Sequence, residues 1–235
     1  MKSYGMRGVL ILFAAASVIA RANPEVYTCA RLPEPSGWAE YLSKGLRLHD
    51  PQATRMIPVV GDIVHGRVQD LKERLDAGLD TSATLQLMPI DEGMSLLTLA
   101  IAACQKGIVD LLIERGANVN GKDSDTPLVV AAGKAEDDIV ALLLSRGAQI
   151  DKTDFMGHTA LEDAVRQRHA RTVQKLLEYG SDVNRDIGGG GTVLAFVDKS
   201  FDPNEVRIAQ LLRAHGAAAQ YVDLNCDARC EDSQE

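Results

Sequence analysis

The sequence predicts an all-α solenoid of about five helix-turn-helix repeats with short hairpin tips. Three observations support this fold class. A Ser or Thr that precedes an apolar run recurs at positions 95, 126, 159 and 192, with spacings of 31, 33 and 33 residues. Each run is followed by a second apolar segment that ends at a Gly. Because aromatic residues make up only 4% of the chain, the core must be built from Leu, Val, Ile and Ala.

Each part of the repeated pattern has a physical reason. The hydroxyl of the leading Ser or Thr can cap free backbone N–H groups, and a Pro such as Pro127 suits the first helical turn. The second helix carries Val and paired Leu inward and ends at a Gly, which adopts a left-handed conformation at little cost. One such unit cannot bury its own apolar face, so neighbouring units must stack on it. An ordinary helical bundle would not repeat the Gly ending in register.

The repeated segments, at residues 95–120, 126–148, 159–180 and 192–217, resemble the ankyrin-repeat family, whose period is close to 33 residues. The resemblance covers residues 56–217 and implies repeats at about 56–90, 91–120, 121–153, 154–186 and 187–217. The first repeat is degraded, because Asp62 falls near the place where the family prefers Ala. We expect an enlarged loop at residues 81–91 and a lengthened turn at residues 200–204.

Residues 1–22 have the pattern of a secretory signal peptide. Lys2 and Arg7 precede an apolar run at residues 9–20, and residues 20–22 (Ala-Arg-Ala) provide the small-x-small cleavage pattern. The run is shorter than the roughly 20 apolar residues that span a bilayer, which favours cleavage over an uncleaved anchor. We therefore expect export to the periplasm and no membrane association after signal cleavage.

Two segments flank the repeats. Residues 23–55 are predicted to form an N-terminal helical cap that shields the open end of the stack, with a partner-binding segment as the alternative. Residues 218–235 are predicted to form an acidic tail that contains cysteines. Cys226 and Cys230 lie four residues apart in this tail, so we expect a local disulfide between them. A bridge from the tail or from Cys104 to Cys29 is the alternative.

Charge and motifs exclude several classes of function. After removal of residues 1–22 the chain carries 22 basic and 33 acidic residues without a basic stripe, which argues against a nucleic-acid partner. The five His residues show no HExxH spacing, and the Gly run at residues 188–191 lacks the Lys-Ser/Thr of a phosphate-binding loop. Two neighbouring thiols without a matching His or Cys pair do not make a zinc site. We therefore expect no enzyme activity, no cofactor and no metal ion.

In ankyrin-repeat proteins the hairpin tips and the inner helices form the binding groove, and the resemblance implies the same surface here, with another protein as the partner. Phe155 and Met156 are the strongest candidates, because apolar anchors on a tip are typical hot spots; packing against the adjacent hairpin is the alternative. The acidic tips suggest a basic or polar partner surface. The candidate partner-binding residues are Glu92, Met94, Lys122, Asp123, Asp125, Phe155, Met156, His158, Arg166, Gln167 and Lys199.

Two roles fit an exported binding module of this kind. An immunity-type protein would bind and silence a toxic enzyme in the bacterial periplasm. The alternative is an accessory scaffold that stabilises a resident periplasmic enzyme, because exported bacterial ankyrin-repeat proteins that resemble this chain have been linked to catalase function and peroxide resistance. A neighbouring toxin gene would favour the first role, and a neighbouring catalase gene would favour the second.

Overall fold

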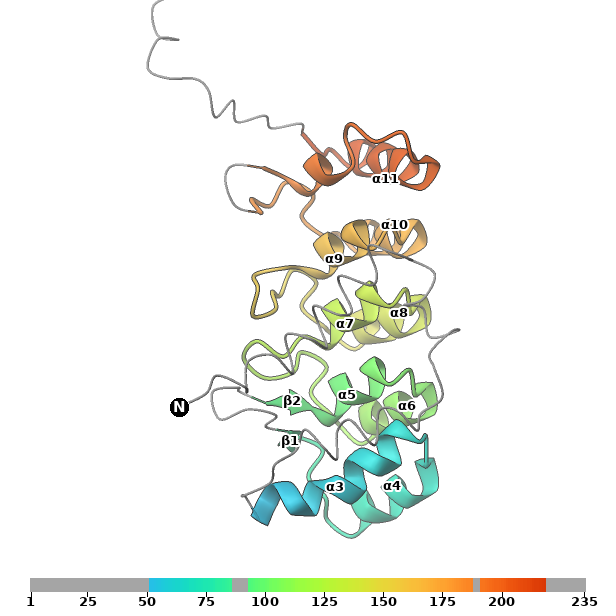
Figure 1. Ribbon diagram of the computed structural model, residues 1–235, viewed down its shortest axis with the longest axis vertical. Coiled ribbons are helices and arrows are strands. Elements are labelled where there is room, and N and C mark those ends of the chain that lie inside the picture. Colours follow the sequence, from blue (N-terminus) through green and yellow to red (C-terminus); the bar gives the residue numbers. More distant parts are fainter. Residues whose placement is uncertain (1–50, 86–92, 188–190, 219–235) are drawn as a thin grey trace, which may run out of the picture.

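The computed structural model describes residues 51–85, 93–187 and 191–218, which form one stack of helix pairs (Figure 1). This arrangement confirms the all-α repeat solenoid predicted from the sequence. A short antiparallel pair of strands is the only sheet among the described residues. The elements are α3 (Pro51–Val64), α4 (Val68–Asp76), β1 (Thr84–Leu85), β2 (Met94–Ser95), α5 (Leu96–Ala102), α6 (Lys106–Glu114), α7 (Pro127–Gly133), α8 (Asp137–Ser145), α9 (Ala160–Arg166), α10 (Ala170–Glu178), η3 (Val193–Phe196) and α11 (Pro203–Ala214).

The first helices of the pairs stack on one another, and so do the second helices. Helices α3, α5, α7, α9 and η3 contact one another in that order, and α10 contacts both α8 and α11. The hairpins between pairs project beside the first helices, away from the second helices (Figure 1). We call the surface of the hairpins and first helices the hairpin side, and we call α4, α6, α8, α10 and α11 the outer helices.

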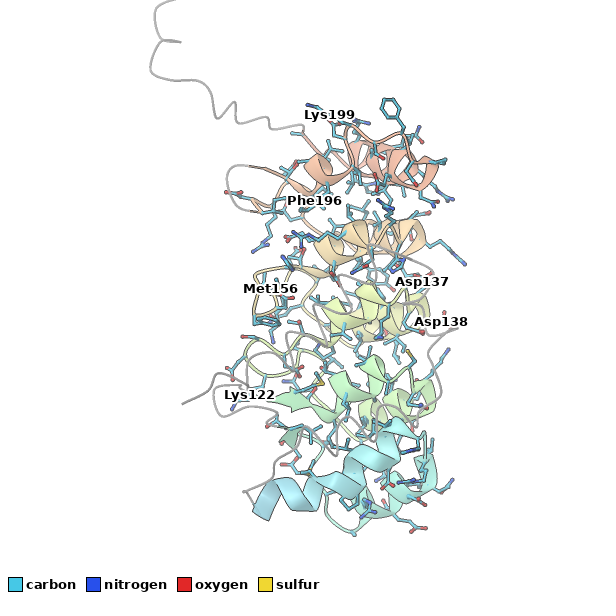
Figure 2. All side chains as sticks on the ribbon, viewed as in Figure 1. Lys122, Asp137, Asp138, Met156, Phe196 and Lys199 are labelled. Atoms are coloured by element: carbon cyan, nitrogen blue, oxygen red, sulfur yellow. The ribbon has the colours of Figure 1, made fainter. Side chains whose placement is uncertain are left out.

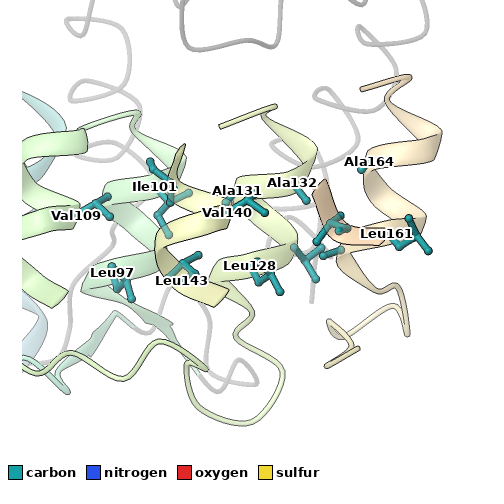
Figure 3. Packing of buried hydrophobic residues seen from close by; sticks show 14 of the residues in the cluster. Leu97, Ile101, Val109, Leu128, Ala131, Ala132, Val140, Leu143, Leu161 and Ala164 are labelled. Atoms are coloured by element: carbon teal, nitrogen blue, oxygen red, sulfur yellow. The ribbon is translucent and has the colours of Figure 1, made fainter. Parts of the chain in front are cut away.

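Helices α5, α7 and α9 each contribute Leu and one or two Ala residues to the core, and the second helices add larger residues such as Val140 and Leu143. Leu97, Leu128 and Leu161 lie in a row along the stack, at 1%, 5% and 1% exposure (Figure 3). Ala131 and Ala164 are fully buried between neighbouring first helices, where a larger side chain would hold the helices apart. Burying each Leu contributes on the order of 2 kcal/mol, so this row is one source of the stability that the repeats give one another.

The predicted Ser or Thr directly precedes the first helix in all four repeats, but its side chain caps that helix in only two of them. Ser95 Oγ accepts a hydrogen bond from the Thr98 backbone N–H, and Thr159 Oγ1 accepts one from the Glu162 N–H. Both caps have extended backbones, with ψ of 157° and 168°. Thr126 makes no such cap, and its ψ of 85° is not that of the two extended caps. Thr192 also makes none, and its hydroxyl instead donates to the Ala218 carbonyl oxygen at 3.1 Å.

The turns at the helix ends use left-handed backbone conformations. Gly147, just after α8, has a φ of 85°, as expected for the Gly that ends each second helix. The turns inside the pairs place non-Gly residues in the same region, including Ala135 at 56° and Arg168 at 63°. Each of these costs roughly 1 kcal/mol relative to Gly. The tight turn is therefore maintained by the packing of the helices that it connects.

The first and last pairs depart from the others. Asp62, at the position where Ala is usual, is only 1% exposed and pairs with Arg67 at 2.7 Å and Arg74 at 2.5 Å. The enlarged loop after the first pair includes the short sheet of β1 and β2. In the last pair the first helix is a single 3₁₀ turn, η3, because Val197 and Asp198 replace the helix-favouring alanines of α7.

Several predicted features lie outside the described residues. These are the signal peptide, most of the N-terminal cap, the Gly run and the tail with Cys226 and Cys230. Helix α3 begins at Pro51, so its first turn belongs to the segment that we assigned to the cap. Cys104, in the turn between α5 and α6, is disulfide-bonded. Within the described ranges, no helix combines the length and apolar character needed to cross a membrane.

Candidate protein-binding surface

The hairpin of the third repeat is held by its own polar groups. Asp125 Oδ2 accepts a hydrogen bond from the Ser95 backbone N–H of the preceding repeat at 3.2 Å. The Asp125 carbonyl oxygen accepts a bond from Lys152 Nζ of the same repeat at 3.0 Å. A Cβ on Gly121 would lie 2.3 Å from that carbonyl oxygen, so the turn needs Gly. Asp125 was predicted to contact a partner, and in the structure its carboxylate joins two repeats.

The rest of this tip is exposed. Lys122 and Asp123 retain 72% and 48% of their side-chain exposure and lie 3.8 Å apart. Asp123 has a φ of 47°, which Asp tolerates better than most residues. An exposed pair of this kind contributes little to stability. Lys122 and Asp123 are therefore exposed at the tip, and their contact with a partner stays a prediction.

The hairpin of the fourth repeat directs its apolar residues outward. Asp154 Oδ1 accepts hydrogen bonds from the backbone N–H groups of Met156 at 2.8 Å and His158 at 2.9 Å. The Asp154 backbone N–H donates to the His158 carbonyl oxygen, and the Asp154 carbonyl oxygen accepts from the Gly157 N–H. These two hydrogen bonds close the turn. Phe155 and Met156 remain 67% and 61% exposed at its tip. The structure thus leaves these two side chains outside the core.

The remaining predicted tip residues have different environments. His158 is only 19% exposed, with Nδ1 3.9 Å from Asp154 Oδ2, so it packs behind the tip. Met94 lies in β2, opposite Leu85, and is partly buried. Glu92 is outside the described residues. The fourth-repeat tip therefore consists mainly of Phe155 and Met156.

The ends of the first helices bring together residues from consecutive repeats. The Arg166 guanidinium, at the end of α9, lies over the Phe196 ring of η3, 4.8 Å from the ring centroid. Phe196 is 40% exposed and was not among the predicted site residues. Lys199 is exposed beyond η3, and Gln167 is partly buried at the end of α9. Figure 2 shows Lys122, Met156, Phe196 and Lys199 on the hairpin side.

A signal for Phe196 was present in the repeat alignment. Val130, Asp163 and Phe196 occupy the same place in three successive repeats, 33 residues apart. In the structure, Asp163 lies against Gly133 of the preceding repeat, and Phe196 likewise contacts Arg166. Gly133 and Arg166 are themselves 33 residues apart. Applying this spacing to the sequence would have paired Phe196 with Arg166.

Two carboxylates of α9 have contrasting environments. Glu162 is 3% exposed and accepts a bond from Arg185 Nη1 at 2.7 Å, so its charge is compensated. Asp163 packs so closely that a Cβ on Gly133 would lie 2.1 Å from its Oδ2. Burial raises the pKa of Asp163 to about 6, and the nearby Asp154 carboxylate adds to the effect while Arg166 opposes it. Asp163 therefore titrates closer to neutral pH than an ordinary Asp.

The outer helices carry charge pairs between repeats. Lys106 of α6 pairs with Asp138 of α8 at 2.9 Å, and Arg115 pairs with Asp76 at 2.7 Å. Asp137 accepts a hydrogen bond from Thr172 Oγ1 at 2.7 Å. A shallow hollow of about 210 Å³ between α8 and α10 is lined by polar and charged side chains. The charged side chains of the outer helices therefore mainly pair with one another.

No group of three or more His, Cys, Asp or Glu side chains is placed to hold a metal ion within the described part of the chain. A family model described as ankyrin repeats (3 copies) matches residues 71–154 and, in an overlapping match, residues 99–187. Together the two matches begin within α4 and extend past the end of α10. They leave out α3, the first helix of the first pair. Repeats of this kind mediate protein–protein interaction and are typically non-catalytic. The chain belongs to the ankyrin-repeat family.

Proposed function

We propose that this chain is a non-enzymatic, periplasmic protein that binds and controls another protein, with inhibition of a toxic enzyme as the form of control. The observation that carries the proposal is the outward display of Phe155 and Met156 at 67% and 61% exposure. Burying these two side chains on a partner would recover on the order of 2 kcal/mol each. The display costs no core packing, because the row of Leu residues lies elsewhere.

The turn that carries this pair is ordered before binding. Asp154 fixes it through hydrogen bonds to the N–H groups of Met156 and His158. A preorganised anchor loses little conformational entropy when it binds, so more of the burial energy becomes affinity. Apolar anchors surrounded by polar residues are typical of protein interfaces.

Two features support the periplasmic location. Lys2 and Arg7 before the apolar run at residues 9–20 match a secretory signal. The disulfide of Cys104 fits an oxidising compartment, because such bonds are rare in reducing ones. Edman sequencing of protein recovered from the periplasm should begin near Asn23. An intact Met1 on that protein would contradict the export proposal.

The binding proposal is tested by photo-crosslinking in the native compartment. A benzophenone amino acid replaces Phe155 in the full-length exported chain, and the cells are irradiated. We expect a covalent adduct with one major protein, identified by mass spectrometry. The matched control places the same crosslinker at Tyr179, which is 49% exposed at the end of outer helix α10. Absence of an adduct at position 155, or the same adducts at both positions, would contradict the proposal.

The captured protein then distinguishes the two forms of control. An immunity-type role predicts a toxic enzyme whose activity falls when the purified chain is added in equimolar amount. The accessory role predicts a resident enzyme, such as a catalase, that loses activity faster without the chain. The variant Phe155→Ala with Met156→Ala should weaken either effect, because it removes the proposed anchor.

A further inference from the structure

The turns inside the helix pairs lie at the opposite end of the helices from the hairpins, because each turn joins the end of a first helix to the start of a second. Gly66, Cys104, Ala135 and Arg168 occupy the same place in four successive turns, and all four have a positive φ. We call these turns the first to the fourth turn, in chain order. They comprise residues 65–67, 103–105, 134–136 and 167–169.

The second and third turns are shielded from water, although they contain polar residues. None of their residues is exposed, whereas the first turn exposes Arg67 and the fourth exposes Arg168. Burial lowers the pKa of the Lys134 ammonium and raises the pKa of the Glu136 carboxyl. Lys and Glu in a surface turn are ordinarily in contact with water. The shielding is therefore a property of these two turns and not of all four.

Cys104 lies in the middle of the second turn and is disulfide-bonded. The chain has three other cysteines, Cys29, Cys226 and Cys230, and all three lie outside the described residues. The Cα atoms of two bonded cysteines are about 4.4–6.8 Å apart, so the partner segment must pass directly beside this turn. The disulfide therefore ties the second turn to one of the two segments that flank the repeats.

The C-terminal tail is poorly placed to reach the second turn. Ala218 is held at the hairpin end of the last pair, where its carbonyl oxygen accepts from the Thr192 hydroxyl. From there to the second turn the chain must pass three helix pairs, about 8–10 Å each, and the length of a helix, a straight distance of about 30 Å. Cys226 follows Ala218 by eight residues, or about 28 Å when fully extended, and Cys230 follows it by twelve. Cys226 therefore falls short, and Cys230 would reach only in a nearly extended chain.

The N-terminal segment has ample length to reach the second turn. Cys29 precedes Pro51, the first residue of α3, by 22 residues, which can span up to about 75 Å. Helix α3 contacts α5, and the second turn follows α5 directly. Pairing with Cys29 also leaves Cys226 and Cys230 to form the local bond that their spacing predicts.

We infer that Cys104 pairs with Cys29, and that this bond holds residues 30–50 across the second and third turns as a clasp that closes only under oxidising conditions. The apolar side chains of this segment, such as Trp38 and Leu42, would exclude water from the two turns. The inference is independent of the proposed binding function, because the hairpins lie at the other end of the helices.

Closing the clasp oxidises two thiols to one disulfide. The thiolate of one cysteine attacks the disulfide of an oxidant, such as a disulfide oxidoreductase or oxidised glutathione, and forms a mixed disulfide. The thiolate of the second cysteine then displaces the oxidant. Two electrons pass to the oxidant, and the protons of the two cysteines end on its departing thiols. A dithiol reductant reverses both steps and opens the clasp.

The first helix pair gains most from the clasp. It stands at the end of the described stack, where repeat proteins need a cap, and α3 contains Pro58 in its interior. The buried carboxylate of Asp62 depends on Arg67 and Arg74. A bond from the segment before α3 to the second turn restricts the unfolded chain and ties the first pair to the second. Reduction should therefore destabilise this end of the stack.

Peptide mapping identifies the bond. The full-length chain is oxidised with oxidised glutathione, its monomer fraction is isolated and digested with trypsin without reductant, and linked peptides are identified by mass spectrometry. Trypsin cuts between all four cysteines, so each lies in its own peptide. We expect residues 75–106 linked to the peptide that ends at Arg31, and residues 214–229 linked to residues 230–235.

Thermal unfolding of two variants measures what the bond does. Cys29→Ser with Cys104→Ser opens the clasp, and its midpoint should fall by about 5–10 °C, as expected for loss of a stabilising disulfide in a chain of this size. The matched control, Cys226→Ser with Cys230→Ser, removes the other two thiols. Its midpoint should change by less than about 2 °C, because a bond between these residues does not join two parts of the stack.

Hydroxyl-radical footprinting tests the shielding. In the clasp variant the modification of Lys134 should rise about twofold or more, because the segment no longer covers the third turn. Arg168, which is already exposed in the fourth turn, is the internal reference and should keep its modification level. The control variant should match the wild-type chain at both residues.

Three outcomes would overturn the inference. They are a link from residues 75–106 to either tail peptide, an equal fall in the unfolding midpoint of both variants, and unchanged modification of Lys134 in the clasp variant. If the clasp variant does not fold, reduction of the folded wild-type chain with dithiothreitol gives the same comparison. A tail-linked Cys104 together with a crosslinked partner at position 155 would reject the clasp and retain the binding function.

Discussion

The third and fourth repeats place chemically different side chains at matching positions. Val130 and Ala148 of the third repeat pack against the core. The residues 33 positions later in the fourth repeat are Asp163 and Ser181. The Ser181 hydroxyl is buried without a hydrogen-bond partner among the described residues, and burial raises the pKa of Asp163. The fourth repeat therefore gives up stability that the third repeat keeps.

The hairpins of the third and fourth repeats also differ, and again the third repeat makes the contacts that stabilise the stack. In the third repeat, Asp125 bonds to the preceding hairpin. In the fourth, Asp154 bonds only within its own turn, and Phe155 and Met156 face outward. A position that lowers stability without an evident structural gain often marks a functional region. On this ground we propose that the binding function lies mainly in the fourth repeat rather than evenly along the stack.

The largest gain in stability is expected at Asp163. Its pKa of about 6 lies above the ordinary 3.8, so the folded state binds the proton more tightly than the unfolded state. Stability should therefore fall as pH rises from about 4 to about 6 and stay low above that. Asp163→Asn removes the charge and should stabilise the chain at pH 7.5 by about 2–3 kcal/mol, since each pKa unit is worth about 1.4 kcal/mol.

Urea unfolding followed by circular dichroism at pH 4.5 and 7.5 measures this effect. The gain in Asp163→Asn should shrink at pH 4.5, where the wild-type carboxyl is protonated. A control, Asp182→Asn, changes an exposed carboxylate of the same repeat and should shift stability by less than about 0.5 kcal/mol. A gain that is equal at both pH values would show that Asp163 is not charged unfavourably in the fold.

The next effect, in the opposite direction, is expected at Asp125. Asp125→Ala removes the acceptor of the Ser95 N–H and should destabilise the chain by about 1–3 kcal/mol, because a partly buried donor is left unpaired. Asp123→Asn removes the same charge from the same tip and should change stability by less than about 0.5 kcal/mol. Equal urea midpoints for the two variants would mean that the third hairpin does not hold its neighbour.

A smaller gain is expected at Ser181. Ser181→Ala supplies the residue that the third repeat has at Ala148 and removes a hydroxyl that is buried without a partner. We expect a gain of about 1 kcal/mol, measured from the midpoint of urea unfolding. The reverse substitution Ala148→Ser should cost a similar amount if the two sites are equivalent. A loss of stability in Ser181→Ala would indicate that the hydroxyl has a partner in solution.

Periodicity predicted most of the fold because each repeated residue acts through local geometry. Leu128 and Ala131 must face the core once the helix forms, and Gly147 must end it. The roles of the acids were harder to predict, because they depend on which N–H group a neighbouring hairpin presents. Asp125 and Asp154 are both acids of hairpin tips at different positions of the repeat, and one joins two repeats while the other closes its own turn.

The side chains at the candidate site could also be predicted only in part from the sequence. Phe155 and Met156 were predicted as partner-binding residues from their place on a tip, and the structure leaves both exposed there. Phe196 was missed, because an aromatic residue in an apolar repeat position is usually buried. It stays exposed because it lies at the end of η3, in the last repeat of the described stack.

The smallest effect on stability is expected for Phe155→Ala with Met156→Ala. A near-zero change would show that these side chains are exposed at the tip and do not pack against the rest of the chain. Both side chains are more than half exposed, so truncation removes little buried area and should change the free energy of unfolding by less than about 0.5 kcal/mol. Leu161→Ala in the same repeat removes a side chain of 1% exposure and should cost about 2–5 kcal/mol. Urea unfolding measures both variants. If the double variant lost more than about 1 kcal/mol, the tip would be packed against its neighbouring hairpin, and the fourth repeat would resemble the third in using its tip for stability.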